Sequence, residues 1–218
     1  MSISIKNFIK TLLNSEKDFG MSYFSNNLSM LDNILDMEEC KNYYNIYAVG
    51  GFVMMTNNLR FSSKDIDAFF ENSDPILSEA INKVGKITHN SEWMNNNVQT
   101  NKYNLEELRE LKHLVSLNKN KAELYRNYEH FSLYTIPLSI IMISKLLILR
   151  SESNDENDVI TIFENYYKSN LQKLKNDIKI YGKQMNNYNL YHDMLLNLNI
   201  LFHEKGYIKD LNYFDDLK

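Results

Sequence analysis

The 218-residue sequence predicts an α+β fold, in which a mixed sheet is flanked by helices and followed by a C-terminal helical extension. Two observations carry this prediction. Over the first 150 residues, short β-branched and aromatic runs alternate with apolar residues at helical spacing, as expected for strands connected by helices. Beyond residue 158 the apolar residues recur only at helical spacing. We therefore expect one domain at residues 1–150, with N-terminal helices over 1–40, and a helical region at 151–218.

The N-terminal forty residues are expected to form two amphipathic helices. The first covers about residues 1–20, where the apolar residues fall on one helical face and no uninterrupted apolar signal segment is present. The second runs from about Asn26 to Glu39, because Leu28, Leu31 and Leu35 repeat at helical spacing.

A strand, a turn and a second strand are expected next. Tyr44–Val49 is aromatic and β-branched, and it ends at Gly50 and Gly51 as a buried strand that enters a tight turn would. A short helix is expected at Phe52–Thr56. The segment Lys64–Phe70 alternates in polarity at its start and is apolar afterwards, which predicts the second strand.

A helix is expected to begin at Asp74, because an aspartate can cap the first turn and Pro75 suits the first helical position. This helix should end near Gly85. Residues 91–120 are polar and ambiguous. Leucines at positions 105, 108, 111 and 114 indicate a helix within them.

A third strand and an apolar helix are expected before the predicted domain boundary. Phe131–Ile136 has strand character, and Pro137 opens a helix that ends near Arg150. The helix is interrupted by Lys145 and falls short of the roughly 20 residues needed to span a bilayer, so we expect a buried core helix. Residues 151–157 are expected to be a polar, acidic loop.

Composition limits the classes of partner. A formal net charge of −4 and a pI near 5.8 provide no global electrostatic reason to bind nucleic acid, and no apolar segment suggests a membrane partner. The single cysteine and the five histidines lack zinc-ligand spacing. One cysteine also fits a reducing compartment, so we expect a cytoplasmic protein. A modest basic cluster is read as solvated surface, with RNA docking as the alternative; it comprises Lys112, His113, Lys119, Lys121 and Arg126.

Residues 49–70 combine glycines, an arginine and two aspartates at the spacing G-G-x8-R-x4-D-I-D. In an extended strand, residues two apart point to one face, so Asp65 and Asp67 should converge. Two hard oxygen ligands suit Mg²⁺ or Mn²⁺ that carries substrate phosphates. Gly50 and Gly51 remove two Cβ atoms, which lets the backbone approach phosphate oxygens, and a following helix N-terminus would add a favourable dipole.

This arrangement suits nucleotidyl transfer. With a metal between phosphate and carboxylates, an acceptor hydroxyl could attack the α-phosphorus of a nucleoside triphosphate in line, and pyrophosphate would leave. Gly-Gly turns and D-x-D pairs each occur often by chance. Their ordered combination as strand, turn, helix and strand favours a functional site.

These residues resemble the motif of the nucleotidyltransferase superfamily, near the antitoxin-type minimal nucleotidyltransferases and the abortive-infection toxins. An R-x-[ST]-x-D-[IL]-D string is common there, and residues 60–67 are similar, with one extra residue before the first aspartate. The resemblance implies a nucleotidyltransferase-like mixed sheet. It also implies that Asp65 and Asp67 are the catalytic metal ligands, and that the nucleotide is bound by Gly50, Gly51, Arg60, Ser62 and Lys145.

Two further stretches extend the likeness. Residues 92–98 are similar to a tryptophan-containing W-[LM]-N-[DN]-x-V segment, and residues 145–159 are similar to a K-L-x-A-x-R…D-x-x-D-I string. By this resemblance Asp155 and Asp158 do not contact the metal or the nucleotide, but support the residues that do. Asn157 departs from the pattern, because an aspartate is frequent at its position.

A third carboxylate is expected on a later strand beside the D-x-D pair, but Phe131–Ile136 has no acid and Glu129 lies just before it. The motif and the resemblance imply transfer of a nucleoside monophosphate to a protein or RNA hydroxyl, within a toxin–antitoxin or phage-defence system, and the missing acid favours the alternative. The alternative is a catalytically impaired binding or antitoxin-like protein, with a cognate toxin or antitoxin as its partner.

Two residues have open alternatives. Lys145 lies on an apolar helix, where its ammonium either contacts phosphate or pairs with Asp155 or Asp158. Trp93 either stacks on a base or, as is usual for aromatic residues, packs in the core.

Overall fold

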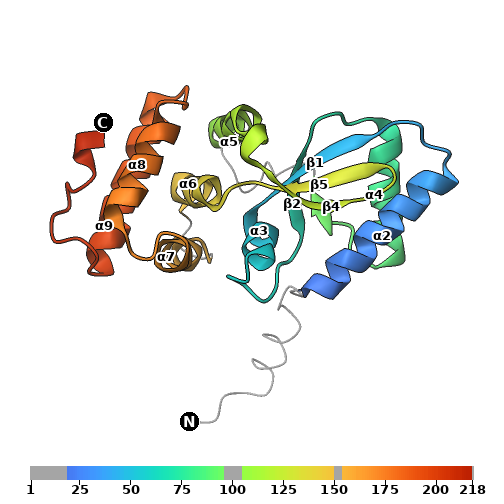
Figure 1. The fold of residues 1–218 in the computed structure, drawn as a ribbon, viewed down its shortest axis with the longest axis horizontal. Coiled ribbons are helices and arrows are strands. Elements are labelled where there is room, and N and C mark those ends of the chain that lie inside the picture. The colour runs from blue at the N-terminus through green and yellow to red at the C-terminus, as the bar shows by residue number, and fades with distance from the viewer. Residues whose placement is uncertain (1–18, 96–104, 150–153, 218) are drawn as a thin grey trace, which may run out of the picture.

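The computed structural model describes residues 19–95, 105–149 and 154–217 (Figure 1). Its centre is a five-stranded mixed sheet in the order β3-β2-β1-β5-β4. β1 pairs antiparallel with β2 and parallel with β5, while β3 is parallel to β2 and β4 antiparallel to β5. The strands are β1 (Tyr44–Val49), β2 (Ile66–Phe70), β3 (Met94–Asn95), β4 (Glu123–Asn127) and β5 (Phe131–Thr135).

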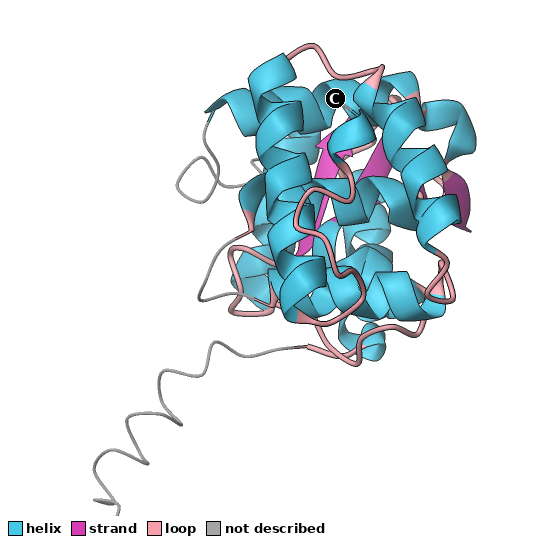
Figure 2. Ribbon diagram, turned by 90° about the vertical axis from the view of Figure 1, so that its left-hand side faces the viewer, coloured by secondary structure: helices cyan, strands magenta, loops and turns pink. Residues whose placement is uncertain are grey.

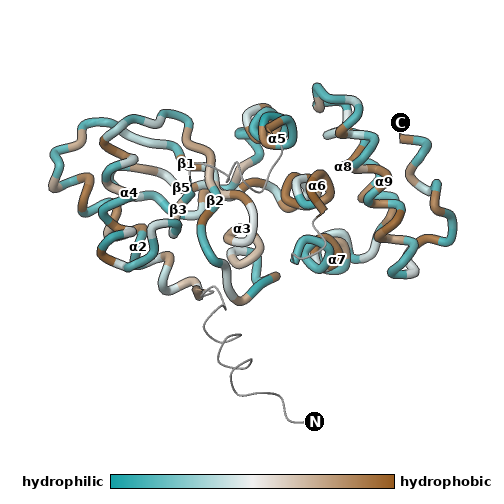
Figure 3. Tube along the Cα trace, turned by 180° about the vertical axis from the view of Figure 1, so that it is seen from behind, coloured by the Kyte–Doolittle hydropathy of each residue, from teal (hydrophilic) through white to brown (hydrophobic). Residues whose placement is uncertain are grey.

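Some helices pack beside the sheet, and the C-terminal helices form a separate layer beyond it (Figure 1). α2 (Met21–Met37) and α4 (Pro75–Ile87) pack against each other beside the strands (Figures 1 and 3). In the view from the C-terminal side, helices stand in front of the strands (Figure 2). The remaining helices are α3 (Gly50–Thr56), α5 (Leu105–Leu117), α6 (Leu138–Ile148), α7 (Asp155–Asn165), α8 (Leu171–Gly182) and α9 (Tyr188–Glu204), with short 3-10 turns at Lys119–Lys121 and Asp215–Leu217.

α6 joins the sheet to the C-terminal helices. Every residue of this helix except Lys145 and Ile148 is buried. It packs against α3 and α5 on one side and against α7, α8 and α9 on the other, and its brown tube lies between them in Figure 3. α6 thus contacts helices from both of the predicted regions, 1–150 and 151–218. The division of the chain at residue 150 stays a prediction.

The α+β class and most predicted elements are confirmed. β1 has the predicted bounds, and Asp74 caps α4 by accepting a hydrogen bond from the Leu77 amide at 2.9 Å. α2 begins five residues before its expected start and ends two residues before its expected end, and α4 ends two residues later than expected. Most of the helix predicted over residues 1–20 lies outside the described residues. The predicted end of the apolar helix, Arg150, also lies outside them.

Two strands were not predicted, and three helices begin earlier than expected: α2 at Met21, α3 at Gly50 and α7 at Asp155. The side chains of β4 are mostly exposed, because it is an edge strand, and β3 has only two residues. Neither shows an apolar alternation. α7 begins at Asp155 inside the predicted acidic loop, where acidic side chains in the first turn suit the positive end of the helix dipole.

No helix in the described ranges is both long enough and apolar enough to cross a bilayer.

Candidate functional site

The turn after β1 requires glycine for two reasons. Gly50 has a φ of +67°, in the left-handed region that strains residues with a Cβ. A Cβ at this position would also lie 2.8 Å from Oδ2 of Asp67. Asp67 pairs in register with Val49, the last residue of β1, so the sheet itself places this carboxylate against the turn. The sequence motif therefore corresponds to a real contact between glycine and aspartate.

Gly51 is covered by the loop that connects α3 to β2. A Cβ on Gly51 would lie 2.6 Å from Oγ of Ser63 and 3.2 Å from Nη1 of Arg60. The Ser63 hydroxyl donates to the Asp65 carbonyl at 3.0 Å, and its backbone exchanges two hydrogen bonds with Phe19. These contacts bring Arg60 to the glycine turn, and its predicted contact with the nucleotide stays a prediction.

The serine that packs against Gly51 is Ser63, whereas the sequence pointed to Ser62. The extra residue in the R-x-[ST]-x-D-[IL]-D string explains the difference. Counted back from Asp65, the position two residues before the first aspartate belongs to Ser63. Counting from Asp65 would have identified it. A nucleotide contact by Ser62 stays a prediction.

The two aspartates occupy different local structures. Asp67 is the second residue of β2, while Asp65 lies just before the strand begins. Both are partly buried. Within the described ranges, no group of three or more His, Cys, Asp or Glu side chains comes together as a metal site. Two carboxylates are a smaller set, which Mg²⁺ or Mn²⁺ would complete with phosphate oxygens and water. Oδ2 of Asp67 lies directly against the Gly50 backbone, so an ion held by this carboxylate would be close to a phosphate bound at the turn.

The residue beside Asp67 on the other side is an amide. β3 places Asn95 in register with Asp67, and paired residues of neighbouring strands share a face of the sheet. The Nδ2 atom of Asn95 is buried and has no hydrogen-bond partner. β5, the strand considered for a third carboxylate, lies beyond β1 and contains no acid. The strand positions paired with Asp67 are thus filled by Val49 and Asn95.

β4 does contribute a carboxylate at this end of the sheet. Glu123 pairs in register with Thr135 at the end of β5, and Thr135 pairs with Ala48 near the end of β1. Three strand spacings separate Glu123 from β2, which corresponds to roughly 14 Å at about 4.8 Å per strand. Glu123 is therefore too far from Asp67 to share one metal ion with it. The sequence did not identify this acid, because β4 has no strand pattern.

A network of ions links the glycine turn to α7. The Lys145 ammonium lies 2.6 Å from Oδ1 of Asp155 and 3.1 Å from Oδ2 of Asp158. Nη1 of Arg60 lies 3.6 Å from the same Asp158 oxygen. The side chain of Asp155 is 1% exposed and that of Lys145 14%. The sequence predicted a pair with Asp155 or Asp158, and the structure shows Lys145 paired with both; its contact with phosphate stays a prediction.

Asp158 is placed to receive a further donor. Its Oδ2 atom is within ion-pair distance of both cations, but neither contact has the geometry of a hydrogen bond. Attraction between the charges still holds at these distances. The oxygen is buried, so an additional hydrogen-bond donor would stabilise it.

Trp93 and the basic cluster have structural partners. Trp93 is fully buried and donates from its indole nitrogen to the Ile81 carbonyl at 3.0 Å, so the base-stacking alternative is wrong for this residue. Lys119 pairs with Glu71 at 2.7 Å and lies over the Tyr47 ring, and this hydrogen bond lowers the pKa of Glu71. Lys121 and Arg126 also lie over tyrosine rings, those of Tyr181 and Tyr128. These contacts favour the interpretation of the basic cluster as solvated surface.

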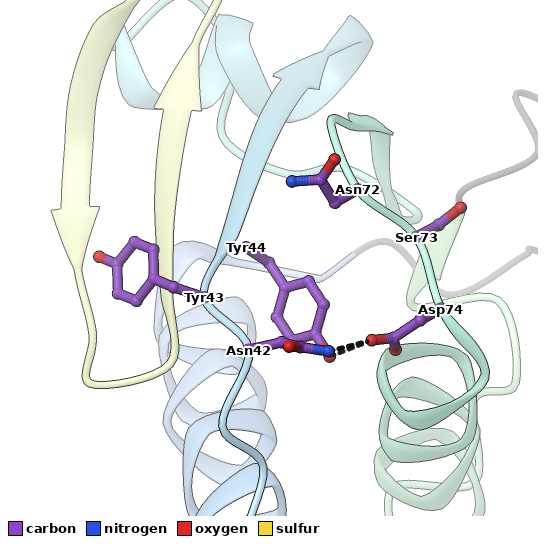
Figure 4. Close-up of a pocket in the computed structure, with 6 residues that line it drawn as sticks. All are labelled: Asn42, Tyr43, Tyr44, Asn72, Ser73 and Asp74. Atoms are coloured by element: carbon purple, nitrogen blue, oxygen red, sulfur yellow. Dashed lines mark hydrogen bonds between the residues drawn. The ribbon is translucent and has the colours of Figure 1, made fainter.

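A cavity of about 320 Å³ lies at the opposite end of β1 from the glycine turn (Figure 4). Asp74 lines it and accepts hydrogen bonds from Tyr44 and Asn42, each at 2.8 Å. Burial alone would raise the pKa of Asp74, but these bonds and the Leu77 amide hold it below the ordinary value. Burial, followed by hydrogen bonds with Cys40 and Asp74, raises the pKa of Tyr44. The cavity thus surrounds a helix cap whose polar groups are satisfied, so we place the candidate site at the glycine turn.

Comparisons with protein families, with curated proteins and with solved structures found no match to this chain.

Proposed function

We propose that this chain is a metal-dependent nucleotidyltransferase, which moves a nucleoside monophosphate from a nucleoside triphosphate to a hydroxyl on a protein or RNA. The contact between Gly50 and Asp67 carries this proposal. A left-handed glycine brings a backbone without a side chain directly against a strand carboxylate, an arrangement suited to hold phosphate beside a metal ion. Arg60 and Lys145 add cationic groups from two other segments.

Each residue has a distinct task in the proposed reaction. The Gly50–Gly51 backbone would seat the phosphates, and Arg60 and Lys145 would offset their negative charge. Asp65 and Asp67 would hold Mg²⁺ or Mn²⁺, which when bound would supply stabilisation of negative charge on the phosphates. Asp155 and Asp158 would position Lys145 through its two ion pairs.

One observation favours a second candidate function. Asn95 stands beside Asp67, and a neutral amide cannot take the proton of an attacking hydroxyl. With an amide at this position, the chain would bind nucleotide and metal without transferring the nucleotide. Such a protein would act as an antitoxin-like regulator, with a cognate toxin as its partner.

Incubation with each of four α-labelled nucleoside triphosphates, Mg²⁺ or Mn²⁺, and cell extract separates these functions. Transfer predicts label on a macromolecule with wild type and none with Asp65→Asn/Asp67→Asn. The regulatory candidate predicts metal-dependent binding of the triphosphate without label on any acceptor. Absence of both binding and label would refute the proposed function.

A further inference from the structure

A fully exposed aromatic residue lies in the loop that covers Gly51. Phe61 is 100% exposed, although it is a large apolar side chain. The residues around it in sequence are polar: Arg60, Ser62 and Lys64. Single exposed apolar residues are common on protein surfaces, so exposure alone does not assign a role. The position of Phe61 beside the glycine turn is the second observation.

The flanking residues tie this loop to the candidate site. Arg60 on one side of Phe61 would contact a Cβ on Gly51 at 3.2 Å, and Ser63 on the other side would contact it at 2.6 Å. Two hydrogen bonds between the backbones of Ser63 and Phe19 hold the loop at this position. Phe61 therefore lies in a loop whose residues on either side of it, Arg60 and Ser63, both lie against Gly51.

The chemistry of the surroundings favours a nucleobase as the occupant. A protein-docking surface needs roughly 800 Å² of buried area on each partner with an apolar centre, which a single phenylalanine among charged and hydroxyl residues does not supply. A base needs one aromatic face. Trp93, the chain's only tryptophan, is buried in the core and cannot provide that face.

We propose that Phe61 is the stacking platform for the base of the nucleotide whose phosphates occupy the Gly50–Gly51 turn, an inference that rests on the proposed function. Stacking uses the π-face that all bases share, so Phe61 contributes affinity with little discrimination among the four bases. Phosphate binding is independent of it. The base and the triphosphate are thus recognised by different parts of one loop-and-turn unit.

Calorimetric titration with Mg–ATP and with Mg–tripolyphosphate, which lacks a base, tests this separation. Phe61→Ala should weaken Mg–ATP binding on the order of tenfold and leave Mg–tripolyphosphate binding unchanged. Phe61→Tyr should restore the affinity. Met37→Ala is the matched control, because Met37 is 81% exposed on a different element. Equal weakening of both ligands, or of neither, would overturn the inference.

A spectroscopic test separates stacking from a general effect on the loop. Phe61→Trp adds an exposed tryptophan to the buried Trp93, and a base stacked on it should quench the added emission. Mg–ATP should quench and Mg–tripolyphosphate should not. Binding of Mg–ATP without quenching overturns the stacking role but leaves the proposed function intact. Failure of wild type to bind either ligand removes the proposed function, and the inference with it.

Discussion

Replacement of Lys145 by methionine tests the ion network that joins the glycine turn to α7. Methionine keeps much of the apolar stem on a buried helix, so the change removes the charge with little loss of packing. The two carboxylates around Lys145 remain buried, with side chains that are 1% and 8% exposed. Arg60 stays within ion-pair distance of Asp158.

The structure sets the expected magnitude. Removal of one partner from a buried ion pair costs about 3–5 kcal/mol, because the remaining charge is left uncompensated. The Lys145 side chain is 14% exposed, so water screens part of the interaction and we expect the lower end of this range. Asp155→Asn in the Lys145→Met background should recover part of the loss, since it removes a buried carboxylate that has lost its Lys145 partner.

Chemical denaturation of wild type, both single variants and the double variant measures this coupling. Lys83→Met is the matched control: Lys83 pairs with Glu38 at the surface, where both side chains are about half exposed, so its unfolding midpoint should not change measurably. Titration of Lys145→Met with Mg–NTP measures the second role. Contact with phosphate predicts an affinity loss of about 1.5–3 kcal/mol in addition to the loss of stability.

Two results would refute the reasoning on Lys145. Wild-type stability in Lys145→Met would show that the ion network does not hold the fold. A double variant less stable than Lys145→Met alone would show that the Asp155 carboxylate is not destabilising after the loss of Lys145. Reduced stability with unchanged nucleotide affinity would limit Lys145 to its structural pairing and remove it from the site.

Three further predictions concern the site and the helix cap. Asp65→Asn with Asp67→Asn should abolish metal-dependent NTP binding in calorimetry and leave the thermal melt near wild type; loss of folding would instead make the carboxylates structural. Gly51→Val should weaken NTP binding and also destabilise the fold, because a Cβ meets Ser63 at 2.6 Å. Gly51→Ala should cost about 1–3 kcal/mol in denaturant unfolding, and Ser63→Ala should recover part of this cost if that contact is the cause. Asp74 has a lowered pKa in the folded state, so its contribution to stability is present above the ordinary value of 3.8 and is lost as pH falls through the folded pKa. Asp74→Asn should therefore reduce the loss of stability measured between pH 5 and acid; an unchanged pH profile would contradict this.

The elements with strong local signals were predictable from the sequence. β1 is an apolar, β-branched segment that ends at two glycines, and its bounds match. Asp74 and Pro75 begin α4 as a cap and a first-turn proline should. Apolar spacing identified the C-terminal helices as a group. In each case the determinant lies within one turn or one strand, where sequence neighbours are also spatial neighbours.

The edge of the sheet was not predictable in the same way. β4 is polar and exposed, and β3 is two residues long, so neither has a pattern that distinguishes it from a loop. Their existence depends on pairing with β5 and β2. Because β3 was missed, the residue beside Asp67 was missed with it.

By itself the sequence determined the candidate residues of the site: two glycines after a strand, an arginine, two aspartates, and a lysine followed by two more acids. The tertiary structure alone decided which of them meet. It packs Ser63 rather than Ser62 on Gly51, places Asn95 beside Asp67, and joins Lys145 to both acids of α7. Strand register and the path of a loop set these contacts. Both arise from pairing between segments far apart in the chain, which local periodicity does not encode.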